Sequence, residues 1–236
     1  MKTRRNFWAI LVVFAALAVM AGCELQDQTT GPDSQPPPFP VVAFKGPQTN
    51  STNAEAQYTK TAVEAMNGFS SYFLIFSGLT ATASENTFTW TYTVQNLTIR
   101  LTATRQSNGD YAWKMIYNGS DSQGRSYNNW TSLEGTTSAD SRSGSWIVYE
   151  ENSTTKAADY TWSTNSANAL TGSFKLYSAG VLATQITLTS NADNTGELKI
   201  YDGALLVYRS VWQANGSGQW WRYDANGNIT SSGSWT

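Results

Sequence analysis

From residue 85 to residue 236 the chain alternates apolar and polar side chains and contains no proline. The stretch Thr87–Val94 alternates threonine with large apolar residues, and Leu97–Ala103 continues the alternation. A period of two is that of a β-strand with one buried face, and proline is rare in sheets because it lacks an amide donor. The apolar phase slips by one residue at Gln95-Asn96, as a tight hairpin turn requires. The stretch therefore predicts successive β-hairpins.

Turn signals divide this stretch into short strands. The strong ones are Asn108-Gly109, Asn215-Gly216 and Asn226-Gly227, and the weaker ones are Gly124, Gly135, Gly180 and Gly203. We expect about 10–12 strands, and because no room remains for crossover helices, the neighbours are antiparallel. Adjacent strands are rotated by about 20–25°. We therefore predict a mainly β fold, an antiparallel meander curled into an up-and-down barrel or half-barrel.

A helical segment is predicted before the strands, over residues 51–80. Thr52 and Glu55 have the spacing of a capping box, which marks a helix start. An apolar stripe at helical spacing comprises Ala62, Met66, Phe69, Phe73 and Phe76. Asn67-Gly68 interrupts the helix and divides the segment. We expect one helix packed on the open side or mouth of the barrel, forming a single domain with residues 85–236.

A short motif recurs in the strand region: glycine, any residue, a large apolar residue, two further residues and tyrosine. Its copies begin at Gly144, Gly172, Gly196 and Gly218. We expect the glycine to relieve the turn and the large residue to begin the inward-facing series. The last copy, within GQWWRYDANGNI, resembles hairpins of the MORN-variant type. That resemblance implies the shape of a hairpin and no catalytic residue.

The first 22 residues have the composition of a signal peptide. Three cations, Lys2, Arg4 and Arg5, precede an apolar run over Phe7–Met20, which is too short to span a bilayer. The run ends at Met20-Ala21-Gly22-Cys23, which resembles the lipobox of bacterial lipoproteins. The resemblance implies cleavage before Cys23 and a diacylglycerol on its sulfur.

That resemblance also implies a location and a partner. Glu24 after the cysteine implies the outer membrane, with the protein facing the periplasm or the cell surface. The expected partner is the membrane itself, through the lipid anchor. Residues 23–50 contain all six prolines, and we expect the lipidated cysteine and a proline-rich tether there.

Composition excludes several functions. The chain has no histidine and one cysteine, so a Ser-His-Asp triad and a histidine zinc site are excluded. Without the three cations of the leader, 12 cations face 17 acids, a net charge of −5 that does not favour nucleic acid. Adjacent Glu150 and Glu151 follow a strand and point apart. We expect no enzyme activity, metal or cofactor.

Aromatic residues are the positive signal, with 10 Trp and 12 Tyr in the chain. Core packing explains many of them, since aromatic residues favour strands. The candidate ligand-binding residues are Trp90, Trp113, Trp130, Trp146, Trp220 and Tyr223. We expect a noncatalytic envelope lipoprotein that binds a hydrophobic ligand in or on the curved barrel. A surface glycan-binding module and a structural partner in an envelope complex are the alternatives, and any protein partner is unknown.

Overall fold

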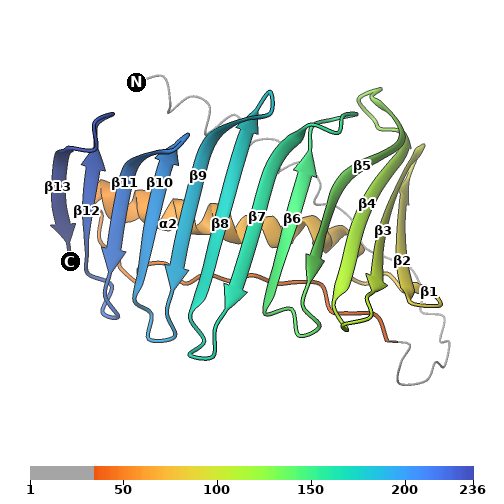
Figure 1. Cartoon of the computed structure of the whole chain (residues 1–236), viewed down its shortest axis with the longest axis horizontal. Helices are drawn as coiled ribbons and strands as arrows, with labels where there is room; N and C mark the ends of the chain where they lie inside the picture. The colour runs from red at the N-terminus through yellow and green to blue at the C-terminus, as the bar shows by residue number, and fades with distance from the viewer. Residues whose placement is uncertain (1–34) are drawn as a thin grey trace.

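The computed structural model describes residues 35–236, so the leader and Cys23 lie outside the described part of the chain. Its strands form one antiparallel sheet in sequence order, which confirms the mainly β meander (Figure 1). There are 13 strands rather than 10–12. Within residues 35–236 the first and last strands remain the two edges of the sheet. The sheet is therefore curved but open, so of the two predicted forms it takes the half-barrel and not the closed barrel.

The strands are joined by short turns, many of them at the predicted glycines. Their bounds are β1 Thr82–Ser84, β2 Thr87–Val94, β3 Leu97–Arg105, β4 Tyr111–Ser120, β5 Ser126–Thr137, β6 Ser143–Tyr149, β7 Lys156–Thr164, β8 Leu170–Ser178, β9 Val181–Ser190, β10 Gly196–Asp202, β11 Leu205–Trp212, β12 Gly218–Tyr223 and β13 Ile229–Trp235. Gly109, Gly216 and Gly227 adopt positive φ in their turns, as predicted. Gly135 instead lies inside β5, so the turn predicted there is wrong.

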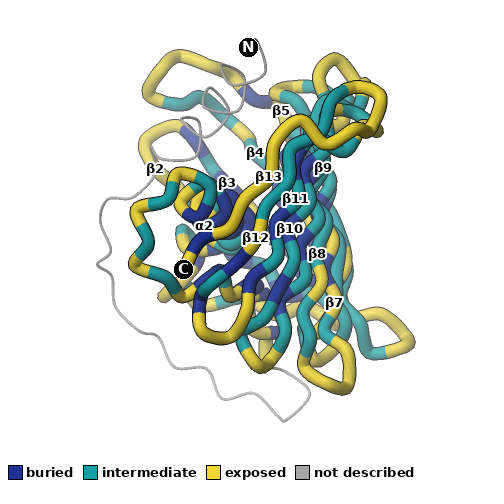
Figure 2. The backbone as a smooth tube through the Cα atoms, turned by 90° about the vertical axis from the view of Figure 1, so that its left-hand side faces the viewer, coloured by how far each residue is buried: buried dark blue, intermediate teal, exposed yellow. Residues whose placement is uncertain are grey.

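The helix lies across the inner face of the open sheet. The α-helix α2 spans Ala54–Asn67 and continues as a 3-10 helix, η2, over Gly68–Phe76. In Figure 1 α2 crosses behind the strands along the long axis of the sheet. Buried positions gather around it in Figure 2. The helix therefore forms a second layer whose buried residues share one core with the sheet.

The predicted apolar stripe is confirmed. Ala62, Met66, Phe69, Phe73 and Phe76 are all buried in the core between helix and sheet. The regular α-helix ends at Asn67, where the sequence predicted an interruption. The tighter 3-10 turn that follows brings three phenylalanines onto the sheet.

The last part of the predicted tether packs against the domain, which differs from the prediction of a free spacer. We call residues 37–49 the strap. Val42 and Phe44 of the strap are buried in the core. Asn67 accepts from the Phe44 amide at 2.7 Å and donates to the Phe44 carbonyl at 2.9 Å. These bonds satisfy backbone groups that packing removes from water, so the strap is held along its length.

The strap and the helix run across the sheet in opposite directions. Phe39 of the strap contacts Trp90 of β2, with ring centroids 5.0 Å apart. Further along, Lys45 N donates to Ser190 Oγ at the end of β9 at 3.0 Å. The helix then returns from β12 toward β4, as the strap and helix colours show in Figure 1. Together the two segments cover the inner face of the sheet.

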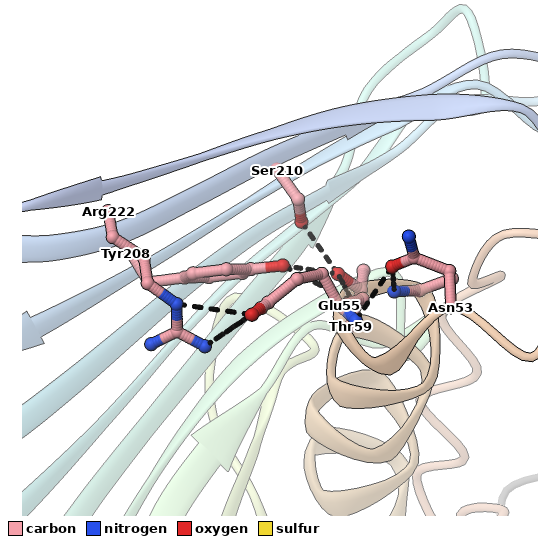
Figure 3. Close-up of polar contacts among 7 residues, drawn as sticks. Asn53, Glu55, Thr59, Tyr208, Ser210 and Arg222 are labelled. Atoms are coloured by element: carbon pink, nitrogen blue, oxygen red, sulfur yellow. Dashed lines mark hydrogen bonds and ion pairs between the residues drawn. The ribbon is translucent and has the colours of Figure 1, made fainter. Parts of the chain in front are cut away.

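Polar contacts fix the start of the helix to the sheet (Figure 3). The N-cap is Asn53, whose side chain accepts from the amides of Glu55 and Ala56, so the predicted capping role of Thr52 is wrong. Glu55 instead forms a two-pronged ion pair with Arg222 of β12, at 2.8 Å to each carboxylate oxygen. Such paired geometry is stronger than a single contact between point charges.

One turn further along α2, a buried hydroxyl group links the helix to β11. Thr59 Oγ1 lies 3.0 Å from the hydroxyls of both Tyr208 and Ser210, as Figure 3 shows. The two β11 residues face inward, and Thr59 and Ser210 are fully buried. Because each hydroxyl has a partner, burial of this cluster avoids the cost of an unsatisfied polar group.

The motif glycines have a different role from the predicted one. They lie in strands, without positive φ, and face inward. Three lie beneath a tryptophan of the neighbouring strand, whereas Gly172 lies beneath Phe44 of the strap. Gly144 is paired with Trp162, Gly196 with Trp212, and Gly218 with Trp235. A Cβ added at these glycines would lie 2.1–2.3 Å from the indole ring. The glycine therefore makes room for an aromatic ring, a tryptophan in three copies and Phe44 in the fourth, rather than relieving a turn.

Candidate functional site

Three of the six predicted binding residues belong to the core. Trp90, Trp113 and Trp146 are 3%, 2% and 1% exposed. Phe73 of η2 packs on Trp113 and Trp146, with ring centroids 6.1 and 5.0 Å apart. Their rings fill the space between sheet and helix, so we assign them to packing.

The remaining three lie at the surface or near it. Trp220 faces inward above Gly233, whereas its neighbour Trp221 faces outward beneath Arg209, whose Cζ lies 4.9 Å from the ring centroid. Tyr223 faces outward beside exposed Ile229 of β13. Trp130 differs from these because it lines a groove beside β5, although it is paired with Tyr117 and packs against the core on the inner side of the sheet. The six residues are therefore not brought together.

The groove exists because β5 leaves its neighbour. The pairing of β5 with β6 covers only Leu133–Thr137 of the 12 residues of β5. Before this point β5 bends toward β4, as Figure 1 shows. An irregularity opposite Met115 and Ile116 and the positive φ of Asn129 accompany the bend. Bulges commonly redirect strands next to functional sites.

The groove has a volume of about 980 Å³ and is wide open to solvent. Three groups of residues line it: the departing part of β5, the turn between β6 and β7, and the sheet below. The lining residues are Lys114, Ser126, Asn128, Asn129, Trp130, Thr131, Glu134, Tyr149, Asn152, Ser153 and Thr154. Amides and hydroxyls dominate this lining, with the indole of Trp130 as the large apolar surface.

Contacts across the groove hold its two walls at a fixed separation. Trp130 Nε1 donates to the Ser153 carbonyl at 3.2 Å. Asn152 Nδ2 donates to the Ser126 carbonyl at 2.9 Å. The indole is also stacked on Tyr127, with ring centroids 5.5 Å apart and planes inclined by 19°. Trp130 is thus fixed on two sides, which lowers the entropy lost when a ligand binds.

The floor of the groove combines a cation, a carboxylate and a phenol. Tyr149 of β6 donates to Glu134 of β5 in a short hydrogen bond. Partial burial, and then this hydrogen bond to Glu134, raise the pKa of Tyr149 to about 12. The phenol therefore stays protonated and neutral at physiological pH. Lys114 lies beside them on β4.

This arrangement suits recognition better than catalysis. A fixed aromatic ring surrounded by amides, hydroxyls and one carboxylate can hold a ligand that has both C–H faces and many hydroxyl groups. The negative face of an aromatic ring attracts polarised C–H groups. In the described residues no group of three or more His, Cys, Asp or Glu side chains could hold a metal ion.

Sequence reasoning singled out Trp130 but missed the residues around it. Asn128 and Asn129 precede Trp130 directly, and this Asn-Asn-Trp run was a usable signal. The opposite wall, Asn152 to Thr154, lies in a turn more than 20 positions away. Only the pairing of the strands brings these segments together.

No protein-family model and no curated protein matches the chain. Within residues 35–236, no helix is both long and apolar enough to cross a membrane.

Proposed function

We propose that this protein is a noncatalytic, lipid-anchored envelope protein that binds a glycan in the groove beside Trp130. The observation that carries the proposal is the groove lining, a fixed indole among amide and hydroxyl groups. Sugars offer C–H faces for the ring and hydroxyl groups for the amides. An open groove also admits a chain that continues beyond the site at both ends.

The packing of the inner face favours this proposal over binding of a hydrophobic ligand. A ligand inside the curved sheet would need the space that α2, η2 and the strap occupy. Phe44 of the strap and Phe69 of η2 are both buried there. Co-purification of a lipid, detected by native mass spectrometry of the full chain, would support the hydrophobic-ligand alternative instead.

A glycan array probed with the full-length protein tests the proposal. We expect the protein to bind short oligosaccharides. Asn128→Ala should lower the affinity roughly tenfold, because it removes a side-chain amide whose hydrogen bond to the sugar contributes about 1.5 kcal/mol. Asn128 is exposed, so this variant should fold normally. Trp130→Ala should abolish binding, whereas Trp221→Ala, an outward-facing tryptophan far along the sheet, should not change it. A folded protein that binds no glycan would contradict the proposal.

The lipid anchor is tested separately, because Cys23 lies outside the described residues. We expect the wild-type protein to partition with membranes and to incorporate labelled fatty acid. Cys23→Ala should release the protein into the soluble fraction, since stable anchoring needs acyl chains. Membrane partitioning of the Cys23→Ala variant would contradict this part of the proposal.

A further inference from the structure

The repeated motif places its tyrosine on the outer face of the sheet. The motif glycine and the large residue two positions later face inward, and the tyrosine follows the glycine by five positions. Because the period is two, an odd separation puts the tyrosine on the opposite face. The four tyrosines are Tyr149 on β6, Tyr177 on β8, Tyr201 on β10 and Tyr223 on β12. All four are partly exposed.

Contacts of these tyrosines confirm their outward direction. Tyr149 donates to Glu134, and Tyr177 donates to Asp159 Oδ2 at 2.6 Å. Asp159 lies on β7 between buried Ala158 and Tyr160, so it faces outward. Tyr223 pairs with Ile229, which is 57% exposed.

Each motif tyrosine also lies at an irregularity in the pairing. The register shifts between Val148 and Tyr149, between Leu176 and Tyr177, between Ile200 and Tyr201, and between Arg222 and Tyr223. In each case the next strand carries the extra residue. Bulges recur where a side chain must be aimed. Four bulges at equivalent positions therefore give the four tyrosines the same local strand pairing.

The tyrosines form a row across the strands. Every one of them lies at the end of an even-numbered strand, and these strands run in the same direction, so the row follows one edge of the outer face (Figure 1). Neighbouring strands are about 4.8 Å apart, which puts successive tyrosines about 10 Å apart across the sheet. Tyr201 and Tyr223 are displaced along the strands relative to Tyr149 and Tyr177. The displacement is two residues, because Tyr201 is level with Lys175 rather than with Tyr177.

The row begins in the glycan groove. Tyr149 belongs to the groove floor and is also the first tyrosine of the row. A ligand that leaves the groove along the sheet would pass Tyr177, Tyr201 and Tyr223 in turn. The track is therefore continuous with the candidate site.

We propose that the tyrosine row, Tyr149, Tyr177, Tyr201 and Tyr223, binds an extended neutral β-linked polysaccharide that continues out of the groove. Within the pairs Tyr149–Tyr177 and Tyr201–Tyr223, a step of about 10 Å across the strands is close to one disaccharide of such a chain, so one sugar face meets both tyrosines of a pair. Between Tyr177 and Tyr201 the chain must also shift along the strands by two residues. This inference rests on the proposed glycan-binding function and names its ligand class.

The charges beside the row favour a neutral chain. Asp159 is paired with Lys156 at 3.3 Å. Glu197 is paired with Lys199 at 2.8 Å and with Arg209 at 2.7 Å. Ion pairs of this kind leave no strong field of one sign on the surface, so ring stacking rather than charge attraction selects the ligand.

Affinity as a function of chain length tests the inference. The probes are cellooligosaccharides and chitooligosaccharides, from the disaccharide to the decasaccharide, titrated against the full-length protein. We expect short chains to bind weakly in the groove and the longest chains to bind roughly a hundredfold more tightly, because contacts on one chain add through effective concentration.

Variants separate stacking from folding. Tyr177→Leu and Tyr201→Leu should each lower the affinity for long chains roughly three- to tenfold and leave the affinity for the disaccharide unchanged. Tyr177→Phe keeps the ring and should bind as the wild type does, although it loses the bond to Asp159. Gln219→Ala, on the outer face of β12 away from the row, is the matched control.

The outcomes distinguish the two proposals. Binding of short chains without any gain in affinity on lengthening would overturn the tyrosine row and leave the groove intact. Failure of folded protein to bind either series at any length would overturn the row, and a blank glycan array would overturn the groove as well. If the leucine variants instead lose a crosslinked protein partner in cells while keeping glycan affinity, the row is a protein interface and the inference is wrong.

Discussion

Replacing Gly196 by alanine should destabilise the protein, although alanine normally stabilises a chain relative to glycine. That ordinary gain, about 0.4–1 kcal/mol, comes from the reduced entropy of the unfolded chain. At Gly196 a Cβ would lie 2.1 Å from Trp212 Cζ2 and 2.6 Å from the Thr189 carbonyl oxygen. Van der Waals contact requires about 3.5 Å or more, so the ring or the strand must move by more than 1 Å.

The size of the effect follows from the burial of the ring. Trp212 is 1% exposed and sits in the core, so it has no free space to enter. Overpacking of this kind costs about 1–3 kcal/mol. Because the contact involves a large ring and a backbone oxygen, we expect the upper end of this range and a net loss of about 2 kcal/mol after the entropic gain.

Urea unfolding followed by circular dichroism measures this loss. We expect a lower midpoint with an unchanged slope, which indicates a change in stability rather than in the denatured state. Gly68→Ala is the matched control, since Gly68 has φ −59° and nothing lies within 4 Å of an added Cβ. That substitution should stabilise the protein by about 0.5–1 kcal/mol.

A double-mutant cycle tests the cause. In a Trp212→Leu background the ring is absent, so Gly196→Ala should cost little or stabilise. The coupling energy should reach about 1–3 kcal/mol, as it does for residues in contact. Equal costs of Gly196→Ala in both backgrounds, or a stabilised single variant, would refute the role of glycine as space for the indole.

Two further predictions concern the helix start and alkaline pH. Asn53→Ala should lower the free energy of unfolding by about 1 kcal/mol because it removes the N-cap, whereas Thr52→Ala should be neutral; equal effects in thermal melts would contradict the assigned cap. The pKa of Tyr177 is raised to about 12 by its hydrogen bond to Asp159 and by partial burial. A folded-state pKa above the unfolded value near 10 means that the folded protein favours the neutral phenol. The contribution of Tyr177 to the free energy of unfolding should therefore be complete below pH 10 and be lost between about pH 10 and 12. Denaturant midpoints across this interval check the sign. Tyr177→Phe should make the decline shallower without removing it, because Tyr149 also has a raised pKa.

The sequence alone determined the local structure of this protein. A side-chain period of two follows directly from the geometry of a strand, so the alternation over Thr87–Val94 was sufficient to predict a half-buried strand. Asn-Gly turns and the break at Asn67-Gly68 were readable for the same reason, because each depends on residues that are adjacent in the chain. These signals predicted an antiparallel meander with one helix.

The tertiary structure decided everything that depends on distant segments. Whether the sheet closes depends on whether its first and last strands pair, and among the described residues they do not. Phe44 and the helix cover its inner face. The motif glycines are explained only by the aromatic rings that strand pairing and the strap place against them. The groove likewise exists only because β5 leaves β6, which brings Trp130 to Ser153. Such contacts arise from long-range pairing and packing, and no local pattern of residue types contains that information.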